Sequence, residues 1–231
     1  MRDFARAREQ MVEKQIARRG VRDPLVLKAM GEVPREDFVS RALRDFAYDD
    51  APLPIGEDQT ISQPYIVGLM IQTAAVKPDD KVLEVGAGSG YAAAALSRIA
   101  AKVYAIERRP ALADAARKRL SELGYDNVDL RVGDGAQGFG EAAPFDAILV
   151  SAGGESVPPK LKEQLVIGGR LVIPIGPQGN GQRLLRITRR SADEYEIEDF
   201  GAVSFVPLIV PENEGDKAKS ERLASEGYPG K

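Results

Sequence analysis

Residues 82–90 read Val-Leu-Glu-Val-Gly-Ala-Gly-Ser-Gly, and this stretch decides the fold of the chain. Val82, Leu83 and Val85 suit a central parallel strand that is covered on both faces. The glycines that follow allow a sharp backbone turn and let a ligand lie against bare peptide groups. Residues 89–100 are predicted to be a helix, so its first N–H groups would point into the turn. We therefore predict a strand, a ligand-binding turn and a helix in succession.

The spacing of Gly86, Gly88 and Gly90 narrows the choice of ligand. Dinucleotide sites typically use G-x-G-x-x-G and bind a pyrophosphate at the helix end, whereas this turn reads G-x-G-x-G and follows Glu84. In that form it resembles the first motif of S-adenosylmethionine-dependent methyltransferases. S-adenosylmethionine carries a sulfonium cation and no phosphate, so a nearby carboxylate favours it and disfavours a diphosphate. The alternative is a structural glycine turn between strand and helix.

Two further strand ends carry residues that suit a nucleoside. Glu107 ends the second predicted strand and can accept hydrogen bonds from both hydroxyls of a ribose. Asp134 follows the third strand, where a carboxylate can bind the exocyclic amine of adenine and Gly135 allows close approach. Taken singly, Glu107 could be a surface carboxylate balanced by the next two arginines, and Asp134 a turn aspartate. The carboxyl ends of these strands lie at one edge of the sheet. We therefore predict that Glu84, Glu107, Asp134 and Gly135 together form a site for S-adenosylmethionine.

Composition limits the classes of function. The chain has 231 residues, 43% hydrophobic and 29% charged, which is typical of a globular domain large enough for its own core. A net charge of −3 argues against nucleic-acid binding. The N-terminal sequence lacks the apolar stretch of a signal peptide, and no apolar run has the length of a membrane span, so we expect a cytoplasmic protein without membrane contact.

The chain contains no cysteine and no histidine. Thiolate chemistry, a histidine base and histidine or cysteine metal ligands are therefore excluded, and we predict no metal site. Catalysis must rest on positioning and electrostatics, or on carboxylate, lysine, tyrosine or hydroxyl groups.

The order of predicted elements indicates an α/β fold. Residues 3–46 are predicted to be helical, residues 47–61 irregular and residues 63–75 helical again. The alternation that follows predicts a doubly wound, mostly parallel seven-stranded sheet of Rossmann-like methyltransferase type, with an N-terminal helical extension and antiparallel C-terminal strands. The predicted strands are residues 81–85, 103–106, 128–132, 145–151, 169–175, 184–188 and 202–210.

We predict one methyltransferase domain over residues 1–211. Residues 1–76 form its helical part with the loop for the methyl acceptor, and residues 77–211 form the cofactor-binding sheet. Residues 212–231 are rich in Glu, Lys, Ser and Gly and are predicted to be a disordered tail. A short surface helix around residues 217–224 is the alternative for part of it.

Residues 59–65, Gln-Thr-Ile-Ser-Gln-Pro-Tyr, resemble the signature of protein-L-isoaspartate O-methyltransferases. The resemblance implies transfer of a methyl group from S-adenosylmethionine to the free carboxylate of L-isoaspartyl residues in damaged proteins. The ester then cyclises to a succinimide, which begins repair. Further similar stretches lie between about Met11 and Pro207, among them residues 52–56, 133–135, 168–174 and 205–208.

The resemblance also implies roles for individual residues. Ser62 and Thr60 would be the catalytic pair that holds the acceptor near the sulfonium. Since no base is present to activate a serine, we expect Ser62 to donate a hydrogen bond; a helix N-cap is the alternative role. The residues expected to bind the substrate are Ile61, Tyr65, Phe205 and Val206. The last two could pair with an extended substrate backbone or belong to a plain core strand.

The sequence departs from the family pattern in two places. Glu36 stands where the family commonly has a histidine after a Pro-Arg pair, and Glu57 and Asp58 stand within what is commonly Gly-His-Gly-Gln. We expect Glu57 and Asp58 to point to solvent.

Two other functions compete with isoaspartyl methylation. One is methylation of a small molecule or RNA, and the other is a non-catalytic role in which the protein only binds. A monomer is favoured.

Overall fold

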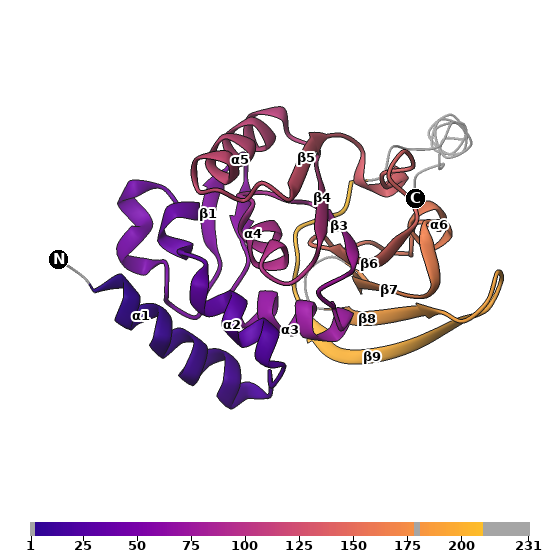
Figure 1. The fold of residues 1–231 in the computed structure, drawn as a ribbon, viewed down its shortest axis with the longest axis horizontal. Coiled ribbons are helices and arrows are strands. Elements are labelled where there is room, and N and C mark those ends of the chain that lie inside the picture. The colour runs from indigo at the N-terminus through magenta and orange to yellow at the C-terminus, as the bar shows by residue number, and fades with distance from the viewer. Residues whose placement is uncertain (1–2, 178–180, 210–231) are drawn as a thin grey trace, which may run out of the picture.

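The computed structural model describes residues 3–177 and 181–209. Within these ranges the chain forms a seven-stranded sheet and a two-stranded hairpin, with helices packed around the sheet (Figure 1). None of the helices in this part of the chain is long and apolar enough to cross a membrane. The helices are α1 (Phe4–Gln10), α2 (Pro24–Glu32), α3 (Pro64–Ala74), α4 (Tyr91–Ser97), α5 (Pro110–Glu122) and α6 (Pro159–Glu163). The strands are β1 (Leu53–Gly56), β2 (Gln59–Ile61), β3 (Lys81–Val85), β4 (Lys102–Glu107), β5 (Val128–Val132), β6 (Phe145–Val150), β7 (Leu165–Ile175), β8 (Gln182–Arg189) and β9 (Tyr195–Val203).

The large sheet has the strand order β5-β4-β3-β6-β7-β8-β9. Strands β3 to β7 run parallel, and β8 and β9 pair antiparallel. The predicted fold class is therefore confirmed. The chain moves outward from β3 to β5 and then returns to the other side of β3 with β6. In sheets of this kind the crevice for a ligand lies at this switch point, beyond the carboxyl ends of the strands.

Strand β3 places its side chains alternately into two hydrophobic cores. Val82 faces the core that contains buried residues of α2, α3, α4 and α5. Leu83 and Val85 face the opposite core, to which Leu161 of α6 belongs. Both faces are covered, which explains why this strand reads as a continuous apolar run interrupted only by Glu84.

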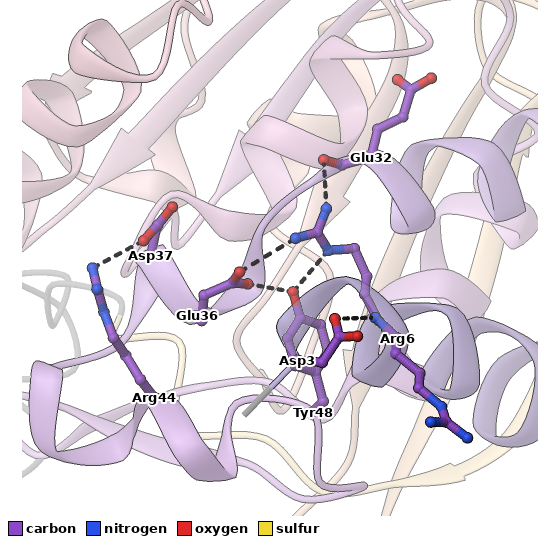
Figure 2. A network of polar contacts seen from close by, with 8 residues as sticks. Asp3, Arg6, Glu32, Glu36, Asp37, Arg44 and Tyr48 are labelled. Atoms are coloured by element: carbon purple, nitrogen blue, oxygen red, sulfur yellow. Dashed lines mark hydrogen bonds and ion pairs between the residues drawn. The ribbon is translucent and has the colours of Figure 1, made fainter. Parts of the chain in front are cut away.

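Helix α1 is tied to the segment that follows α2 by a largely buried polar network (Figure 2). Arg8 donates to the hydroxyl of Tyr48 at 2.8 Å and forms an ion pair of 3.3 Å with Glu36. Tyr48 in turn donates a short hydrogen bond to the second oxygen of Glu36. Burial raises the pKa of Tyr48, so the phenol remains a donor at neutral pH. Glu36, only 7% exposed, is thus engaged within the N-terminal part and is not a lining residue of the hollows described below.

The structure corrects the prediction for residues 47–61, which were expected to be irregular. Strands β1 and β2 pair antiparallel and form a hairpin, with Leu53 opposite Ile61 and Pro54 opposite Thr60. Its turn is made by Glu57 and Asp58, which have positive φ angles of 53° and 55°. Both residues are exposed, as expected.

One smaller prediction and one alternative were also wrong, and another prediction lies outside the described residues. The last strand is Tyr195–Val203 and not residues 202–210, because the polar, alternating stretch before Val203 pairs with β8. Ser62 is not the N-cap of α3; Gln63 holds that position, without a side-chain hydrogen bond. The predicted tail, residues 212–231, lies outside the described ranges. The division into a helical part and a sheet part stays a prediction.

Candidate active site

The glycine turn after β3 has the conformation that its sequence predicts. Gly86, Gly88 and Gly90 have φ angles of 85°, 53° and 86°, in the region that residues with a Cβ rarely adopt. The N–H groups of Gly86 and Ala87 both donate to the carbonyl of Ile106, at 2.8 and 3.1 Å. Gly90 is the N-cap of α4. The turn is thereby fixed at the carboxyl edge of β3 and β4.

Glu84 lies beneath this turn and is almost fully buried, with 1% of its surface exposed. Its Oε2 atom has no hydrogen-bond partner among the described residues. Burial raises the pKa of Glu84 well above its usual value, and the carboxylate of Glu107 raises it further. The side chain lines a small hollow of about 40 Å³ under the turn. A buried carboxylate with a free oxygen is suited to receive a cationic group.

Glu107 connects the glycine turn to the end of β4. Its Oε2 accepts from the N–H of Gly88 at 2.8 Å, and its Oε1 accepts from the N–H of Arg109 at 2.9 Å. The residue is 6% exposed, so the alternative of a surface carboxylate balanced by the next two arginines is wrong. Each carboxylate oxygen can accept a second hydrogen bond. Glu107 lines a pocket of about 110 Å³ and keeps the capacity to bind two hydroxyl groups there.

Asp134 and Gly135 follow β5 but differ in their position. Asp134 accepts from the N–H of Ala136 at 3.1 Å and so caps a short 3₁₀ helix. It is not among the lining residues of the three hollows, whereas Gly135 lines the 110 Å³ pocket. A Cβ atom on Gly135 would lie 2.3 Å from Cγ1 of Val85, so only glycine fits. The structure thus shows the capping role of Asp134, and its adenine-binding role stays a prediction.

The β1–β2 hairpin covers the glycine turn and carries the predicted catalytic residues. A Cβ atom on Gly88 would lie 3.1 Å from Cδ1 of Ile55, so the hairpin packs directly on the turn. Thr60 is exposed and Ser62 is half-buried, and both line the small hollow under the turn. Ile61 also lines that hollow but is only 4% exposed.

A wide groove of about 960 Å³ adjoins these residues. Ser62 and Tyr65 line one side of it, and Phe205 and Val206 line another. The ring of Tyr65 is held by the guanidinium of Arg19, which stacks 3.6 Å from its centroid. Phe205 and Val206 follow the end of β9 and are half-buried, so the alternative of a plain core strand is wrong. Their pairing with an extended substrate backbone stays a prediction.

The groove and the 110 Å³ pocket meet at two hydroxyl side chains. Thr60 and Ser151 line the 960 Å³ groove, the 110 Å³ pocket and the 40 Å³ hollow alike. Ser151 directly follows β6, and its N–H donates to the carbonyl of Val85 at 2.8 Å. A ligand in the groove and a ligand over the glycine turn would therefore touch across Thr60 and Ser151. This geometry suits the transfer of a group between two bound molecules.

Sequence reasoning missed several residues of the groove, among them four that carry polar side chains: Ser151, Arg19, Gln182 and Arg183. Ser151 stands at the end of a predicted strand, so its place at the carboxyl edge could have marked it. Arg19, Gln182 and Arg183 also line the groove, but they come from the N-terminal helices and from β8. Nothing in their local sequence brings them to this edge of the sheet.

The sequence matches known families over most of its length. Residues 6–213 match the family model for protein-L-isoaspartate(D-aspartate) O-methyltransferase. A protein-L-isoaspartate O-methyltransferase from Methylorubrum extorquens is 62% identical over 207 residues, which cover 90% of each protein. One from Protochlamydia amoebophila is 57% identical over 199 residues, covering 86% of this chain and 95% of the relative.

Solved structures agree with this similarity. A Plasmodium falciparum structure described as a protein-L-isoaspartate O-methyltransferase, in complex with S-adenosyl-L-homocysteine, matches with a TM-score of 0.76 and 26% identity. The match covers 87% of this chain and 98% of that one. Another structure named protein-L-isoaspartate O-methyltransferase matches with a TM-score of 0.80 and 28% identity, covering 94% of this chain and 69% of that one.

Proposed function

This chain belongs to the protein-L-isoaspartate(D-aspartate) O-methyltransferase family, and from this premise we propose how its site works. The chain is an S-adenosylmethionine-dependent methyltransferase that acts on the free carboxylate of L-isoaspartyl residues in damaged proteins. The observation that carries the proposal is the junction at Thr60 and Ser151, where a groove large enough for a peptide segment opens onto the glycine turn.

The residues around the glycine turn fit S-adenosylmethionine. Glu84 keeps a buried carboxylate oxygen without a partner, which suits a cationic part of the cofactor. Glu107 keeps free acceptor capacity for the ribose hydroxyls, and Gly135, which packs closely against Val85, lines the same pocket. S-adenosylmethionine supplies a methyl group that its sulfonium activates for transfer. The protein supplies the pocket, the hydrogen bonds and the orientation.

The reaction needs no general base, which agrees with a chain that lacks histidine. The free carboxylate of an isoaspartyl residue is its α-carboxylate, since the chain runs through the side-chain carboxyl; it has a pKa of about 3.5 and is already ionised at neutral pH. The chain must hold this anion in line with the methyl group and exclude water, which is catalysis by proximity and orientation. Ser62 and Thr60 are in place to donate hydrogen bonds to the acceptor, because both line the groove beside the glycine turn.

The shape of the groove supports an acceptor that is part of a polypeptide. Tyr65 and Phe205 provide apolar walls, and Arg19 and Arg183 provide cations at the rim, each paired with an aspartate. These features suit a backbone segment with varied side chains.

Action as a monomer in the cytoplasm, without nucleic acid, stays a prediction from the sequence.

The proposal is tested by methyl transfer from labelled S-adenosylmethionine to an isoaspartyl peptide. The matched control is the same peptide with a normal aspartyl residue. We expect base-labile label in the isoaspartyl peptide alone, because a methyl ester hydrolyses in mild base. Equal labelling of both peptides would contradict the proposed specificity. No labelling, with a small molecule or RNA labelled instead, would favour the competing activity.

A further inference from the structure

The segment Phe205–Ile209 separates the acceptor groove from the cofactor pocket. Phe205 lines the groove, and Val206 lines both the groove and the 110 Å³ pocket. Leu208 and Ile209 line the pocket but not the groove. The segment begins two residues after the end of β9, so it lacks a strand partner at Phe205. Something other than the sheet must hold its backbone in place.

The side chain of Gln182 supplies the missing partner. Its Oε1 accepts from the N–H of Phe205 at 2.7 Å, and its Nε2 donates to the carbonyl of the same residue at 3.4 Å. A carboxamide has an oxygen that accepts and an NH₂ group that donates in the same plane, so it can pair with backbone as a peptide group does. Gln182 is the first residue of β8 and pairs with Val203 of β9. Its side chain therefore continues the β8–β9 pairing beyond the last strand residue.

The fit around this carboxamide is tight. Gln182 is 1% exposed, so it acts on the groove through Phe205 and has almost no surface of its own to offer a substrate. A Cβ atom on Gly153 would lie 2.1 Å from Nε2 of Gln182. Glycine at position 153 is therefore what leaves room for the carboxamide.

The cofactor side of the same segment is held by other contacts. The N–H of Gly153 donates to the carbonyl of Val206 at 2.8 Å, and the N–H of Leu208 donates to the carbonyl of Gly153 at 2.7 Å. Arg108 donates to the carbonyl of Ile209 at 3.0 Å. Loss of the Gln182 contacts would thus free the groove side and leave the pocket side fixed.

We propose that Gln182 is a positioning residue for the methyl acceptor, because its carboxamide fixes the Phe205 wall of the groove. The proposal rests on the proposed function, since it assigns the acceptor to this groove. A loose wall at Phe205 binds the acceptor less well but does not disturb the cofactor. The KM for the isoaspartyl peptide is then the quantity that Gln182 controls.

The test uses Gln182→Met, which keeps the length of the side chain and removes both hydrogen bonds. The matched control is Asn127→Leu, because the carboxamide of Asn127 also binds backbone, at Ser97 and Ala100. Asn127 precedes β5 and so lies at the opposite edge of the sheet from the site. Four quantities are measured for each variant: KM and kcat with the isoaspartyl peptide, the Kd for S-adenosylhomocysteine, and hydrogen exchange of the Phe205 amide.

For Gln182→Met we expect KM to rise about 3- to 10-fold, the range given by the loss of one to two modest hydrogen bonds. The Phe205 amide should exchange faster, while the Kd for S-adenosylhomocysteine changes less than about twofold. Asn127→Leu should leave all four quantities near wild type. Faster exchange with an unchanged KM would overturn the proposal. An equal loss of S-adenosylhomocysteine affinity, or the same rise in KM for Asn127→Leu, would overturn it as well.

Gly153→Ala tests the same contact without changing residue 182 and decides the matter if Gln182→Met does not fold. Its methyl group displaces Nε2, so a raised KM with retained S-adenosylhomocysteine binding supports the proposal, and a wild-type KM overturns it. The wild-type protein is assayed first. If it does not methylate the isoaspartyl peptide at all, the proposed function fails; if it does, only the role of Gln182 is in question.

Discussion

Arg109 and Glu57 form an ion pair of 3.4 Å that joins the end of β4 to the turn of the β1–β2 hairpin. The backbone N–H of Arg109 also donates to Glu107, and the neighbouring Arg108 binds the carbonyl of Ile209. Two consecutive arginines therefore contact the two segments that flank the cofactor pocket. The contact with Glu57 depends on a residue that departs from the common family pattern.

Glu57→Gln should speed the release of S-adenosylhomocysteine. The pair is partly exposed, with 33% and 47% of the two side chains accessible, so it is worth at most about 1 kcal/mol. We expect the dissociation rate at low salt to rise by up to about fivefold, as measured by stopped-flow fluorescence with a displacing ligand. At about 1 M salt the Debye length is near 3 Å, so wild type and variant should converge.

Glu141→Gln is the matched control for this prediction. Glu141 forms an exposed ion pair of 3.1 Å with Arg131 and lines none of the three hollows described. Its removal should leave the dissociation rate unchanged at every salt concentration. A low-salt rate that is equal in wild type and Glu57→Gln would show that the pair does not restrain the pocket.

Ser62→Ala should reduce turnover and leave cofactor binding intact. Ser62 lines the groove and the hollow under the glycine turn, and it does not line the 110 Å³ pocket with Glu107. Loss of a donor that orients the reacting anion lowers kcat by up to about 100-fold. Ser97→Ala removes a hydroxyl that donates to the carbonyl of Ala94 on the same helix, and it should behave as wild type. A large loss of S-adenosylhomocysteine affinity in Ser62→Ala would contradict the positioning role.

Glu84 should make the stability of the cofactor-free protein depend on pH. Burial raises its pKa in the folded state above the unfolded value of about 4.5. Its contribution is therefore fully present below that value and is lost as the pH rises through the folded-state pKa. Glu84→Gln, which cannot ionise, should gain stability relative to wild type as the pH increases above about 4.5.

Urea unfolding across pH, with and without S-adenosylhomocysteine, tests this prediction. The variant should be the more stable protein near pH 7 without ligand, yet bind the ligand more weakly because it lacks the anion. Glu122→Gln, which removes a carboxylate that is 65% exposed on α5, is the control and should show neither effect. A constant difference between Glu84→Gln and wild type at all pH values would refute the assignment.

Gly135→Ala should destabilise the fold and weaken cofactor binding. The new methyl group meets Cγ1 of Val85 at 2.3 Å, an overpacking that typically costs about 1–3 kcal/mol. Gly140→Ala meets nothing within 4 Å and is the control. Val85→Ala should restore part of the loss when combined with Gly135→Ala, since the two changes share one contact. Thermal unfolding and calorimetric titration measure both effects; strictly additive losses would rule out the contact.

The sheet and the cofactor edge were predictable because their signals are local. An apolar strand that ends in Gly86, Gly88 and Gly90 specifies a tight turn by the φ angles that only glycine adopts readily. Glu84 and Glu107 were identified because a carboxylate beside the turn suits a cationic ligand and a carboxylate at the end of the second strand suits a ribose. Their burial and the shared contact with the turn were then found in the structure.

The hairpin and the last strand were not predictable in the same way. The β1–β2 turn uses Glu57 and Asp58 at positive φ, where two-residue hairpin turns prefer asparagine and glycine. Strand β9 is polar and alternates weakly because much of it is exposed, so residues after it looked more like a strand. The contact of Gln182 with Phe205 joins residues 23 apart through a side chain, and no periodicity reports such a contact.

Because Thr60 and Ser151 border the groove and the pocket at once, a single compound could occupy both. An adenosine analogue linked at its 5′ position to a short carboxylate-bearing peptide would place two weak ligands in neighbouring chambers. Tethering makes the second binding event intramolecular, with an effective concentration that reaches about the millimolar range for a short linker. The two adjoining hollows therefore favour a bisubstrate inhibitor, in which the length of the linker is the variable to optimise.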